Sequence, residues 1–522
     1  MAVVKHRSAP DPELKGWPRG IPYIVGNEAA ERFSFYGMKS MLIPYLSTLY
    51  IANQLNEQLA GKMAAHDVHM FNAAVYALPM VGAMVADKLL GKYRTIIALS
   101  LVYCLGHLLL SLLGDSLHGV QLGLAFVALG AGGIKPCVGA HVGDQFGKSN
   151  WHLTKKVFQA FYFAVNFGSF GSYLLMPWML QKYGYGIAFG LPGVLMFIAT
   201  VVFWMGRNKF IHVPGNPGGK LGVIDALSGT LLFVGLLGIW LFGPQFEVPM
   251  AVRAVISLVS LVGGVWLFTY RQKLQPDDGF LTVLLTTVMR GPRAARVRLG
   301  DEAYDGMLAV FRALSVIGFV VLFWALFDQK DTTWVLQAKQ MDRTFHLPLI
   351  GTFTFLPAQI ASANPMLVLM LIPIFIFVVF PLFERMGIKI TPLRRMAVGM
   401  LLTAFSFAVV AILQARLDAG AHVHVVWQII AYLIMTSAEV LVSATGLEFA
   451  YGQAPKRMKS TLMAFWYLTV TFGNLFVVLI MDLTKDKPPV QQFWLFGGIM
   501  LGIAMLFTLR VVFYKGREYA QG

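Results

Sequence analysis

Apolar segments close to twenty residues long recur along the whole chain, separated by short polar stretches. A helix needs about twenty mainly apolar residues to cross the hydrocarbon core of a bilayer. The pattern predicts an all-α polytopic membrane protein with fourteen transmembrane helices. The predicted helices cover residues 24–50, 70–88, 95–113, 119–142, 156–180, 187–206, 221–243, 250–270, 309–327, 352–383, 394–415, 425–450, 460–481 and 491–513.

Long polar segments divide this series into six, two and six helices. The main interruption runs from Arg271 to Asp305 and contains a dense run of arginines. The predicted organisation is a cytoplasmic N-terminus at 1–20, an N-terminal six-helix bundle at 21–206, a linker at 207–308 that holds two extra helices (about 221–243 and 250–270) and a basic cytoplasmic loop, a C-terminal six-helix bundle at 309–515, and a cytoplasmic tail at 516–522.

Lysine and arginine are distributed unevenly over the loops. When successive loops are assigned to alternate sides, the side of the N-terminus carries about three times as many of the 42 Lys and Arg residues as the opposite side. Because positively charged loops stay in the cytoplasm, both termini are expected there. The asymmetry also favours an even number of helices, since a missed helix would invert the pattern downstream.

Composition excludes several classes of protein. The chain is 57% hydrophobic and only 13% charged, and its net charge of +16 comes from dispersed basic residues rather than from a nucleic-acid-binding patch. Cys104 and Cys137 lie in apolar segments and suggest neither a disulfide framework nor a metal site. The first twenty residues lack the apolar core of a signal peptide, so the first helix is expected to be retained.

The first predicted helix begins with four charged residues in the stretch Glu28-Ala-Ala-Glu31-Arg32-Phe-Ser-Phe-Tyr36-Gly37-Met-Lys39. At about 100° per residue, the side chains of these four residues and Tyr36 fall within an arc of roughly 140°. They can therefore turn away from lipid together. Ionisable groups at membrane depth cost about 3 kcal/mol or more each and indicate a functional site. The alternative is a cluster beside the lipid headgroups.

A loop motif and the helix count resemble a known superfamily. The segment Gly82-x4-Asp87-x3-Gly91-Lys92-x-Arg94, between the second and third helices, resembles the cytoplasmic motif of the major facilitator superfamily. The arrangement of two six-helix bundles with two inserted helices is similar to that fold. An ordinary basic turn is the alternative interpretation of the motif.

Three further motifs resemble the proton-dependent oligopeptide transporter family, in the family's order. They are Glu28-x-x-Glu31-Arg32-Phe-x-x-Tyr36-Gly37 on the first helix, Phe161-Tyr162-x-x-Val-Asn166-x-Gly168-Ser169 on the fifth, and Glu439-x3-Ser443-x2-Gly446-Leu447 followed by Ala454-Pro455-x2-Met458-x-Ser460 on the tenth and eleventh. They extend over nearly the whole chain. The extra helix pair resembles that of bacterial members, which implies a peptide transporter of the bacterial inner membrane.

The residues at membrane depth meet the needs of a zwitterionic peptide independently of the resemblance. Such a substrate needs a cation for its carboxylate, an anion for its ammonium, amide partners and apolar room. The candidate cations are Arg32, Lys39 and Lys135; the anions are Asp328 and Glu439; the amides are Asn166 and Asn364; and the walls are Tyr36, Tyr76, Trp324 and Trp466.

The resemblance also implies individual roles. It assigns the peptide carboxylate to the Lys135 and Lys39 side, and the peptide ammonium to the side of Asp328, Asn166 and Asn364. It assigns Glu28, Glu31 and Arg32 to proton coupling with Lys135, and His69 matches a histidine that some members use in proton entry. Two residues depart from the pattern: Phe35 replaces a tyrosine, and Lys39 replaces an arginine that would bind a carboxylate bidentately.

Structural interpretations compete at several of these positions. Trp466 and Tyr76 are also plausible core aromatics, and Asn364-Pro365 is typical of a helix kink. Asp328 is followed by Lys330 and Asp331, as in a solvated loop. His69, placed at the outer end of the second predicted helix, is also typical of an interfacial histidine, and His107 and His141 are interpreted as structural.

Counting these charges suggests a mechanism. Three cations (Arg32, Lys39, Lys135) face four carboxylates (Glu28, Glu31, Asp328, Glu439), so one proton would neutralise the set. Burial disfavours the charged form of an unpaired carboxylate. The hypothesis is a proton-driven symporter in which Lys135 pairs with Asp328 when the outer side closes, and peptide or proton competes for that pair.

The sequence thus predicts a proton-coupled importer of di- and tripeptides that works by alternating access. Its expected partners are peptides, protons and membrane lipid; it is expected to be a monomer, to bind no nucleic acid, and to use a proton gradient and no cofactor. Another small substrate, such as nitrate, an amino acid or a peptide-like compound, is the main alternative. An integral membrane enzyme or a channel is disfavoured, because no phosphate loop, metal-ligand cluster or repeated pore motif is found.

Overall fold

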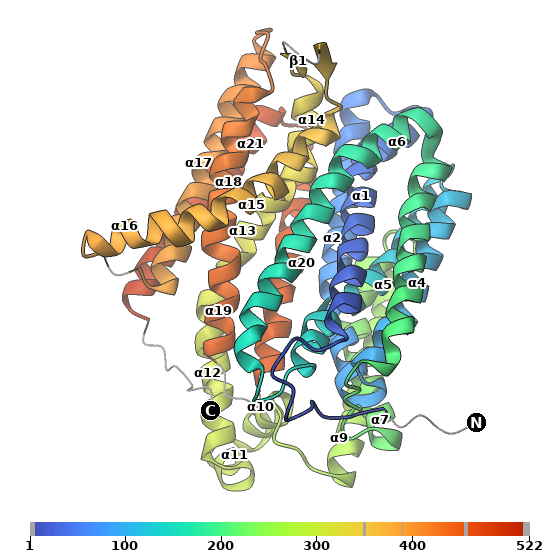
Figure 1. Cartoon of the computed structure of the whole chain (residues 1–522), viewed down its shortest axis with the longest axis vertical. Coiled ribbons are helices and arrows are strands. Elements are labelled where there is room, and N and C mark those ends of the chain that lie inside the picture. The colour runs from blue at the N-terminus through green and yellow to red at the C-terminus, as the bar shows by residue number, and fades with distance from the viewer. Residues whose placement is uncertain (1–5, 348–350, 389, 454–457, 515–522) are drawn as a thin grey trace. The chain divides into compact units, whose positions relative to one another are not determined.

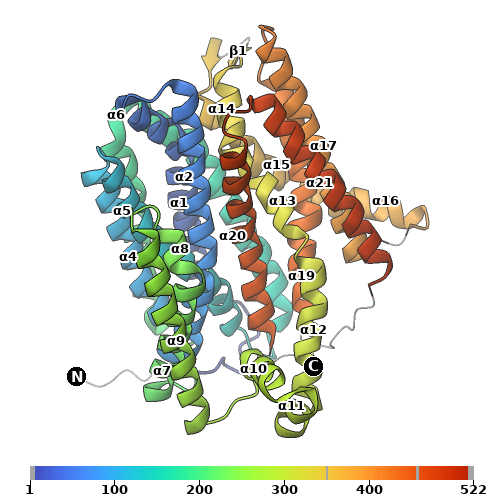
Figure 2. The same cartoon turned by 180° about the vertical axis from the view of Figure 1, so that it is seen from behind.

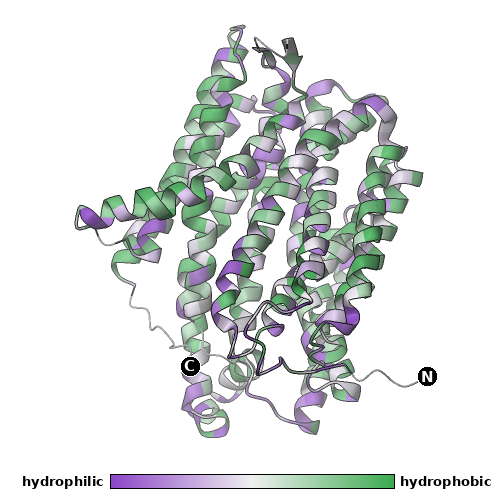
Figure 3. Ribbon diagram, in the orientation of Figure 1, coloured by the Kyte–Doolittle hydropathy of each residue, from purple (hydrophilic) through white to green (hydrophobic). Residues whose placement is uncertain are grey.

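The computed structural model describes residues 6–347, 351–388, 390–453 and 458–514. These residues are almost entirely helical and separate into two compact units. The first unit contains Met1–Leu274 together with Ala358–Pro365, and the second contains Gln275–Pro357 together with Met366–Gly522. Hydrophobic residues cover most of the length of helices such as α17 (Figure 3).

The first unit is built around two long helices, α1 and α6, that pack along each other (Figure 1). Helix α4 packs against both α5 and α6, and α7 packs against α9 and α3. The helices are α1 (Ile21–Ala52), α2 (Glu57–Ala77), α3 (Pro79–Val85), α4 (Lys92–Leu113), α5 (Leu117–Asp144), α6 (Thr154–Met205), α7 (Gly219–Phe233), α8 (Ile239–Phe242) and α9 (Met250–Leu274), with π turns at Ala86–Leu90 and Val234–Gly238 and 3₁₀ turns at Trp151–Leu153 and Gly206–Asn208.

In the second unit, α17 packs against α18 and α21, and α13 packs against α20 (Figure 2). Its two strands pair in antiparallel register, with Thr344 opposite Thr354. The elements are α10 (Phe280–Arg290), α11 (Pro292–Leu299), α12 (Asp301–Ile317), α13 (Val320–Phe327), α14 (Thr333–Lys339), β1 (Thr344–Leu347), β2 (Gly351–Thr354), α15 (Ala363–Ile374), α16 (Phe380–Arg385), α17 (Pro392–Asp418), α18 (Val426–Glu439), α19 (Thr445–Gly452), α20 (Lys459–Leu483) and α21 (Pro489–Val512), with 3₁₀ turns at Asp328–Asp331 and Pro357–Ser362 and π turns at Phe375–Val379 and Val440–Ala444.

Among the described residues, eleven helices are long and apolar enough to cross a membrane, or twelve if the bent pair Asp301–Ile317 and Val320–Lys339 is one span. The predicted number of fourteen is therefore not confirmed. The apolar segment Trp151–Asn208 has 58 residues and consists of two helices joined at a break, in agreement with the two helices predicted at 156–180 and 187–206. Within it, Gly184 has a φ of 78° and interrupts the helical geometry. Helix α1 is long enough, but its charged and polar residues lower its hydropathy.

Two predicted helix boundaries are wrong. The second helix was expected to begin at residue 70, but α2 begins at Glu57, so His69 lies within the helix and is fully buried rather than at its outer end. The predicted helix 352–383 overlaps strand β2, and α15 begins only at Ala363. Asn364 and Pro365 thus lie in the first turn of α15, where a proline is tolerated, and do not form a kink within a helix.

Two glycines allow the close packing of α1 on α6. A Cβ atom on Gly37 would lie 2.6 Å from Cγ of Met176, and one on Gly168 would lie 2.8 Å from the backbone oxygen of Ala29. The second contact is with main chain, which cannot move aside as a flexible side chain can. This close approach fixes the charged beginning of α1 against α6.

We expect Gly168→Ala to destabilise the protein relative to Gly171→Ala, which is a matched control on the same helix. A Cβ atom at Gly171 would meet nothing within 4 Å. Both substitutions gain the same helix propensity, so their difference isolates the clash at Gly168, which we expect to cost about 1–3 kcal/mol. Thermal unfolding of both variants in detergent measures this difference, and equal melting temperatures would contradict the packing described here.

Candidate functional site

The charged residues at the start of α1 form a buried ion-paired cluster. The Arg32 side chain places Nε 2.7 Å from Oε1 of Glu28 and 3.0 Å from Oε2 of Glu31. The two carboxylate side chains are 4% and 0% exposed, and that of Arg32 is 11% exposed. The i,i+4 and i,i+1 spacings on one helix suffice to bring one guanidinium to two carboxylates.

Lys135 on α5 is held in a different way. Its Nζ lies 4.1 Å from the ring centroid of Phe35 and 5.4 Å from that of Tyr76. In the part of the chain that the structure describes, this buried Nζ makes no hydrogen bond. A desolvated ammonium on an aromatic face gains about 2 kcal/mol, so Phe35, which lacks the hydroxyl expected of a tyrosine, still binds the cation through its ring.

Glycines bring Lys135 to this position. A Cβ atom on Gly132 would lie 2.6 Å from the backbone oxygen of Val75, and one on Gly82 would lie 2.3 Å from the backbone oxygen of Gly133. Helices α2 and α3 therefore pack directly on the backbone of α5. This packing places Tyr76, which follows Val75, beside the ammonium of Lys135.

The remaining candidates of the first unit lie further along α1, on α6 and in the segment Ala358–Pro365. Lys39 is buried on α1, and the ring of Tyr36 lies 6.0 Å from that of Tyr173. Asn166 donates a hydrogen bond to the backbone oxygen of Tyr162. Asn364 is buried in the segment Ala358–Pro365, which the structure groups with the first unit, although the sequence assigned it to the C-terminal bundle.

In the second unit, Asp328 lies in the 3₁₀ turn after α13 and is 4% exposed. Asn474 on α20 donates a hydrogen bond of 2.7 Å to its Oδ2. A Cβ atom on the neighbouring Gly473 would lie 2.6 Å from the backbone oxygen of Val321. The small residue thus lets α20 approach α13 closely enough for this hydrogen bond to form.

The two charges that follow Asp328 are also buried, so a solvated loop is excluded. Lys330 and Asp331 are 4% and 3% exposed, and their charged atoms lie 3.4 Å apart. The ammonium of Lys330 lies 3.5 Å from the ring centroid of Phe327, and Tyr432 donates a hydrogen bond to the backbone oxygen of Lys330. In the sequence, Lys330 and Asp331 suggested only a solvated loop after Asp328, and no motif pointed to Asn474.

The aromatic candidates of this unit lie together. The rings of Trp324 and Trp466 are 6.4 Å apart and nearly perpendicular. Gly446 of the third motif packs directly against Trp466, where a Cβ atom would lie 2.2 Å from the ring. Glu439 is half-buried at the end of α18. Ala454 and Pro455 of this motif lie outside the described residues, as does the side chain of Ser460.

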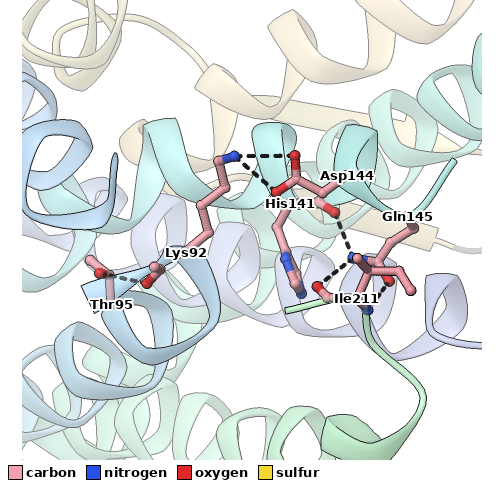
Figure 4. A network of polar contacts seen from close by, with 7 residues as sticks. Lys92, Thr95, His141, Asp144, Gln145 and Ile211 are labelled. Carbon is pink, nitrogen blue, oxygen red and sulfur yellow. Dashed lines mark hydrogen bonds and ion pairs between the residues drawn. The ribbon is translucent and has the colours of Figure 1, made fainter. Parts of the chain in front are cut away.

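The loop motif forms a separate polar network at the ends of α4 and α5 (Figure 4). Lys92 binds both carboxylate oxygens of Asp144, at 3.1 and 2.8 Å. Gln145 accepts a hydrogen bond from the backbone N–H of Ile211 and donates to the backbone oxygens of Ile211 and His141. This network joins the end of α5 to the segment after α6. Because Lys92 is held in an ion pair, this part of the motif is not simply an exposed basic turn.

Helices long and apolar enough to span a membrane, with ion-paired charges buried inside their bundles, define a multi-pass membrane protein. No group of three or more His, Cys, Asp or Glu side chains among the described residues could hold a metal ion. A family model described as the POT family matches residues 93–495, and the chain belongs to that family.

Known relatives agree with this assignment. The chain is 40% identical to the POT family transporter PepTSo, whose structure was determined in meso by crystallography. The two structures align over 96% of this chain and 99% of PepTSo, with a TM-score of 0.77. An auto-inhibited POT family peptide transporter is 36% identical, with coverages of 97% and 99% and a TM-score of 0.78. Human solute carrier family 15 member 2 is 34% identical over 78% of this chain and 51% of its own length. Peptide transporter 3 of Caenorhabditis elegans is 33% identical over 78% and 52%. The chain spans about half the length of these curated relatives.

We expect Lys92→Met to destabilise the first unit, because it leaves the carboxylate of Asp144 partly buried and unpaired. Both side chains are about one-fifth exposed, at 18% and 20%, which suggests a loss of about 1–2 kcal/mol. Arg94→Met is the matched control, since Arg94 is exposed in the same motif. Thermal unfolding compares the two, and an equal loss in both would show that the ion pair contributes nothing.

Proposed function

We propose that the protein is a symporter that couples the inward movement of protons to the import of di- and tripeptides by alternating access. Its family and the names of its relatives support this proposal. We further propose that the protein lies in the inner membrane of a bacterium as a monomer, with both termini in the cytoplasm. The proton gradient is the driving force, and no cofactor takes part.

The observation that carries the proposal is the unequal charge of the two buried sets. In the first unit, the buried cations Arg32, Lys39 and Lys135 exceed the carboxylates Glu28 and Glu31 by one. In the second unit, the buried turn Asp328–Asp331 contains two carboxylates, Asp328 and Asp331, and one cation, Lys330, and the amide of Asn474 donates a hydrogen bond to Asp328. A zwitterion with one carboxylate and one ammonium complements these two sets.

Substrate contacts are assigned accordingly. The peptide carboxylate engages Lys135 and Lys39, and its ammonium engages Asp328 with help from the two amides. The aromatic residues line the space for the side chains of the peptide, and Glu439 adds a further negative charge in the second unit. The proposed substrate-binding residues are Tyr36, Lys39, Tyr76, Lys135, Asn166, Trp324, Asp328, Asn364, Glu439 and Trp466.

Proton coupling is assigned to the charged cluster of α1. One guanidinium cannot fully satisfy two carboxylates, and Oε2 of Glu28 and Oε1 of Glu31 make no hydrogen bond among the described residues. A proton on either carboxylate would weaken the ion pair of that carboxylate with Arg32 and change the electrostatic potential at Lys135. In the proposed cycle, Lys135 and Asp328 are partners in one state, and peptide or proton competes for that pair. His69 is assigned to proton entry.

We expect Glu28→Gln or Glu31→Gln to abolish uptake driven by a pH gradient in proteoliposomes, while exchange of labelled dipeptide across the membrane partly survives. The substitutions remove the proton acceptor but keep the shape of the side chain. Glu13→Gln, at an exposed position, is the control and should behave as the wild type. Concentrative uptake that persists in both cluster variants would refute their coupling role.

We expect Asp328→Ala to remove the preference for a free peptide ammonium. The wild-type protein should bind a dipeptide more tightly than its N-acetylated form, and the variant should bind both equally weakly, with a loss of roughly tenfold or more for the free dipeptide. Binding isotherms of the two ligands on both proteins measure this. A retained preference in the variant would remove Asp328 from the site. Competition of dipeptide uptake by nitrate or free amino acids would instead support the alternative substrates.

A further inference from the structure

The segment between the inserted helices and α12 forms a helical hairpin with an unusual surface. We call residues 280–299, which contain α10 and α11, the basic hairpin. Its two helices pack against each other and against α12, and both views show α11 beside the start of α12 (Figures 1 and 2). Gly291 and Gly300, with φ of 84° and 90°, make the sharp turns at the two ends of α11.

One side of α10 holds the hairpin onto the second unit. Val283 is fully buried, and the ring of Phe280 lies 5.7 Å from that of Phe311 on α12 and 5.9 Å from that of Phe465 on α20. Helix α12 belongs to the bent pair that is apolar enough to cross a membrane. The hairpin is therefore fixed directly beside a membrane-spanning segment.

The exposed positions of the hairpin combine aliphatic side chains with arginines. Val288, Met289 and Val297 are 74%, 77% and 90% exposed, which is costly for apolar groups in water. Arg290, Arg293 and Arg298 are exposed beside them.

The hairpin's fourth arginine differs from these three. Arg296 is used internally, since its guanidinium binds Asp301 and Asp305 at 2.6 and 3.1 Å and lies on the ring of Tyr304. The other three guanidinium groups make no ion pair or hydrogen bond within the described chain. The nearest exposed acid in sequence, Asp301, is already paired with Arg296, and Glu302 is the next one, so the surface keeps a net positive charge.

We propose that the basic hairpin binds anionic phospholipids of the membrane surface. Its free arginines engage lipid phosphates, and Val288, Met289 and Val297 enter the boundary between the headgroups and the acyl chains. Alternating guanidinium and aliphatic groups fit an interface that is charged on one side and apolar on the other. A nucleic acid would leave the three aliphatic side chains in water. Anchoring this hairpin would fix the cytoplasmic end of α12 against the bilayer, without any part in binding peptide.

Native mass spectrometry of the full chain in detergent, titrated with phosphatidylglycerol or phosphatidylcholine, tests this proposal. The wild-type protein should retain phosphatidylglycerol in preference. Because each basic residue near an anionic surface strengthens attraction roughly fivefold, the triple variant Arg290→Gln/Arg293→Gln/Arg298→Gln should lose at least about tenfold in that preference. Its binding of phosphatidylcholine should be unchanged. Equal retention of phosphatidylglycerol by the variant and the wild type would overturn the proposal.

The matched control is Lys148→Gln/Lys155→Gln/Lys156→Gln, which removes the same charge from exposed positions of the first unit. This variant should keep the lipid preference, and an equal loss would show a general effect of net charge and overturn the assignment to the hairpin. Inorganic phosphate should not displace the lipid at matched concentration; full displacement would indicate a simple anion site and likewise overturn it. Dipeptide uptake serves as a check that both variants fold.

A second measurement tests the apolar part. Val297→Cys, in a background with Cys104→Ser and Cys137→Ser, carries an environment-sensitive fluorophore in vesicles with and without phosphatidylglycerol. Emission should shift to the blue when the anionic lipid is present, and high salt should reverse part of the shift by screening the arginines. Emission that is the same in both vesicles would contradict insertion of this side.

Discussion

The constraint on which this structure depends is that charge buried inside an apolar helix bundle must be stabilised by other groups of the protein. Glu28, Glu31 and Arg32 would each cost about 3 kcal/mol or more if they faced hydrocarbon. Their mutual ion pairs remove most of that cost. The burial of the cluster in turn requires α1 to lie close to its neighbours, and the main-chain contact at Gly168 provides that approach. The ion pairs of the cluster and the glycine contacts are therefore both needed to bury these charges.

The second unit meets the same constraint with different chemistry. Asp328 is bound by the amide of Asn474, whereas Lys330 combines an ion pair with Asp331 and a contact with the face of Phe327. An amide donor satisfies a carboxylate without neutralising it. The hydrogen bond from an amide thus distinguishes the surroundings of Asp328 from those of Asp331, which lies beside an ammonium.

Sequence patterns predicted those features that depend on local periodicity. The shared face of the α1 charges followed from helix geometry, and most apolar segments became helices. The patterns failed where tertiary packing decides. The polar first turns of α2, from Glu57 on, hid its true start and misplaced His69. The burial of Lys330 and the role of Asn474 depend on how α13, α18 and α20 meet, which no local spacing encodes, although an Asn after a Gly in an apolar helix was a usable signal.

The way Lys135 is held links stability to function. A carboxylate at contact distance would bind this ammonium strongly and resist exchange, because separating a buried ion pair costs about 3–5 kcal/mol. The faces of Phe35 and Tyr76 stabilise the cation by only about 2 kcal/mol. The ammonium is thus tolerated inside the bundle and still gains energy from meeting an anion. The proposed cycle, in which Lys135 changes partners, requires that intermediate strength, and the plain ring of Phe35 provides it without a tyrosine hydroxyl.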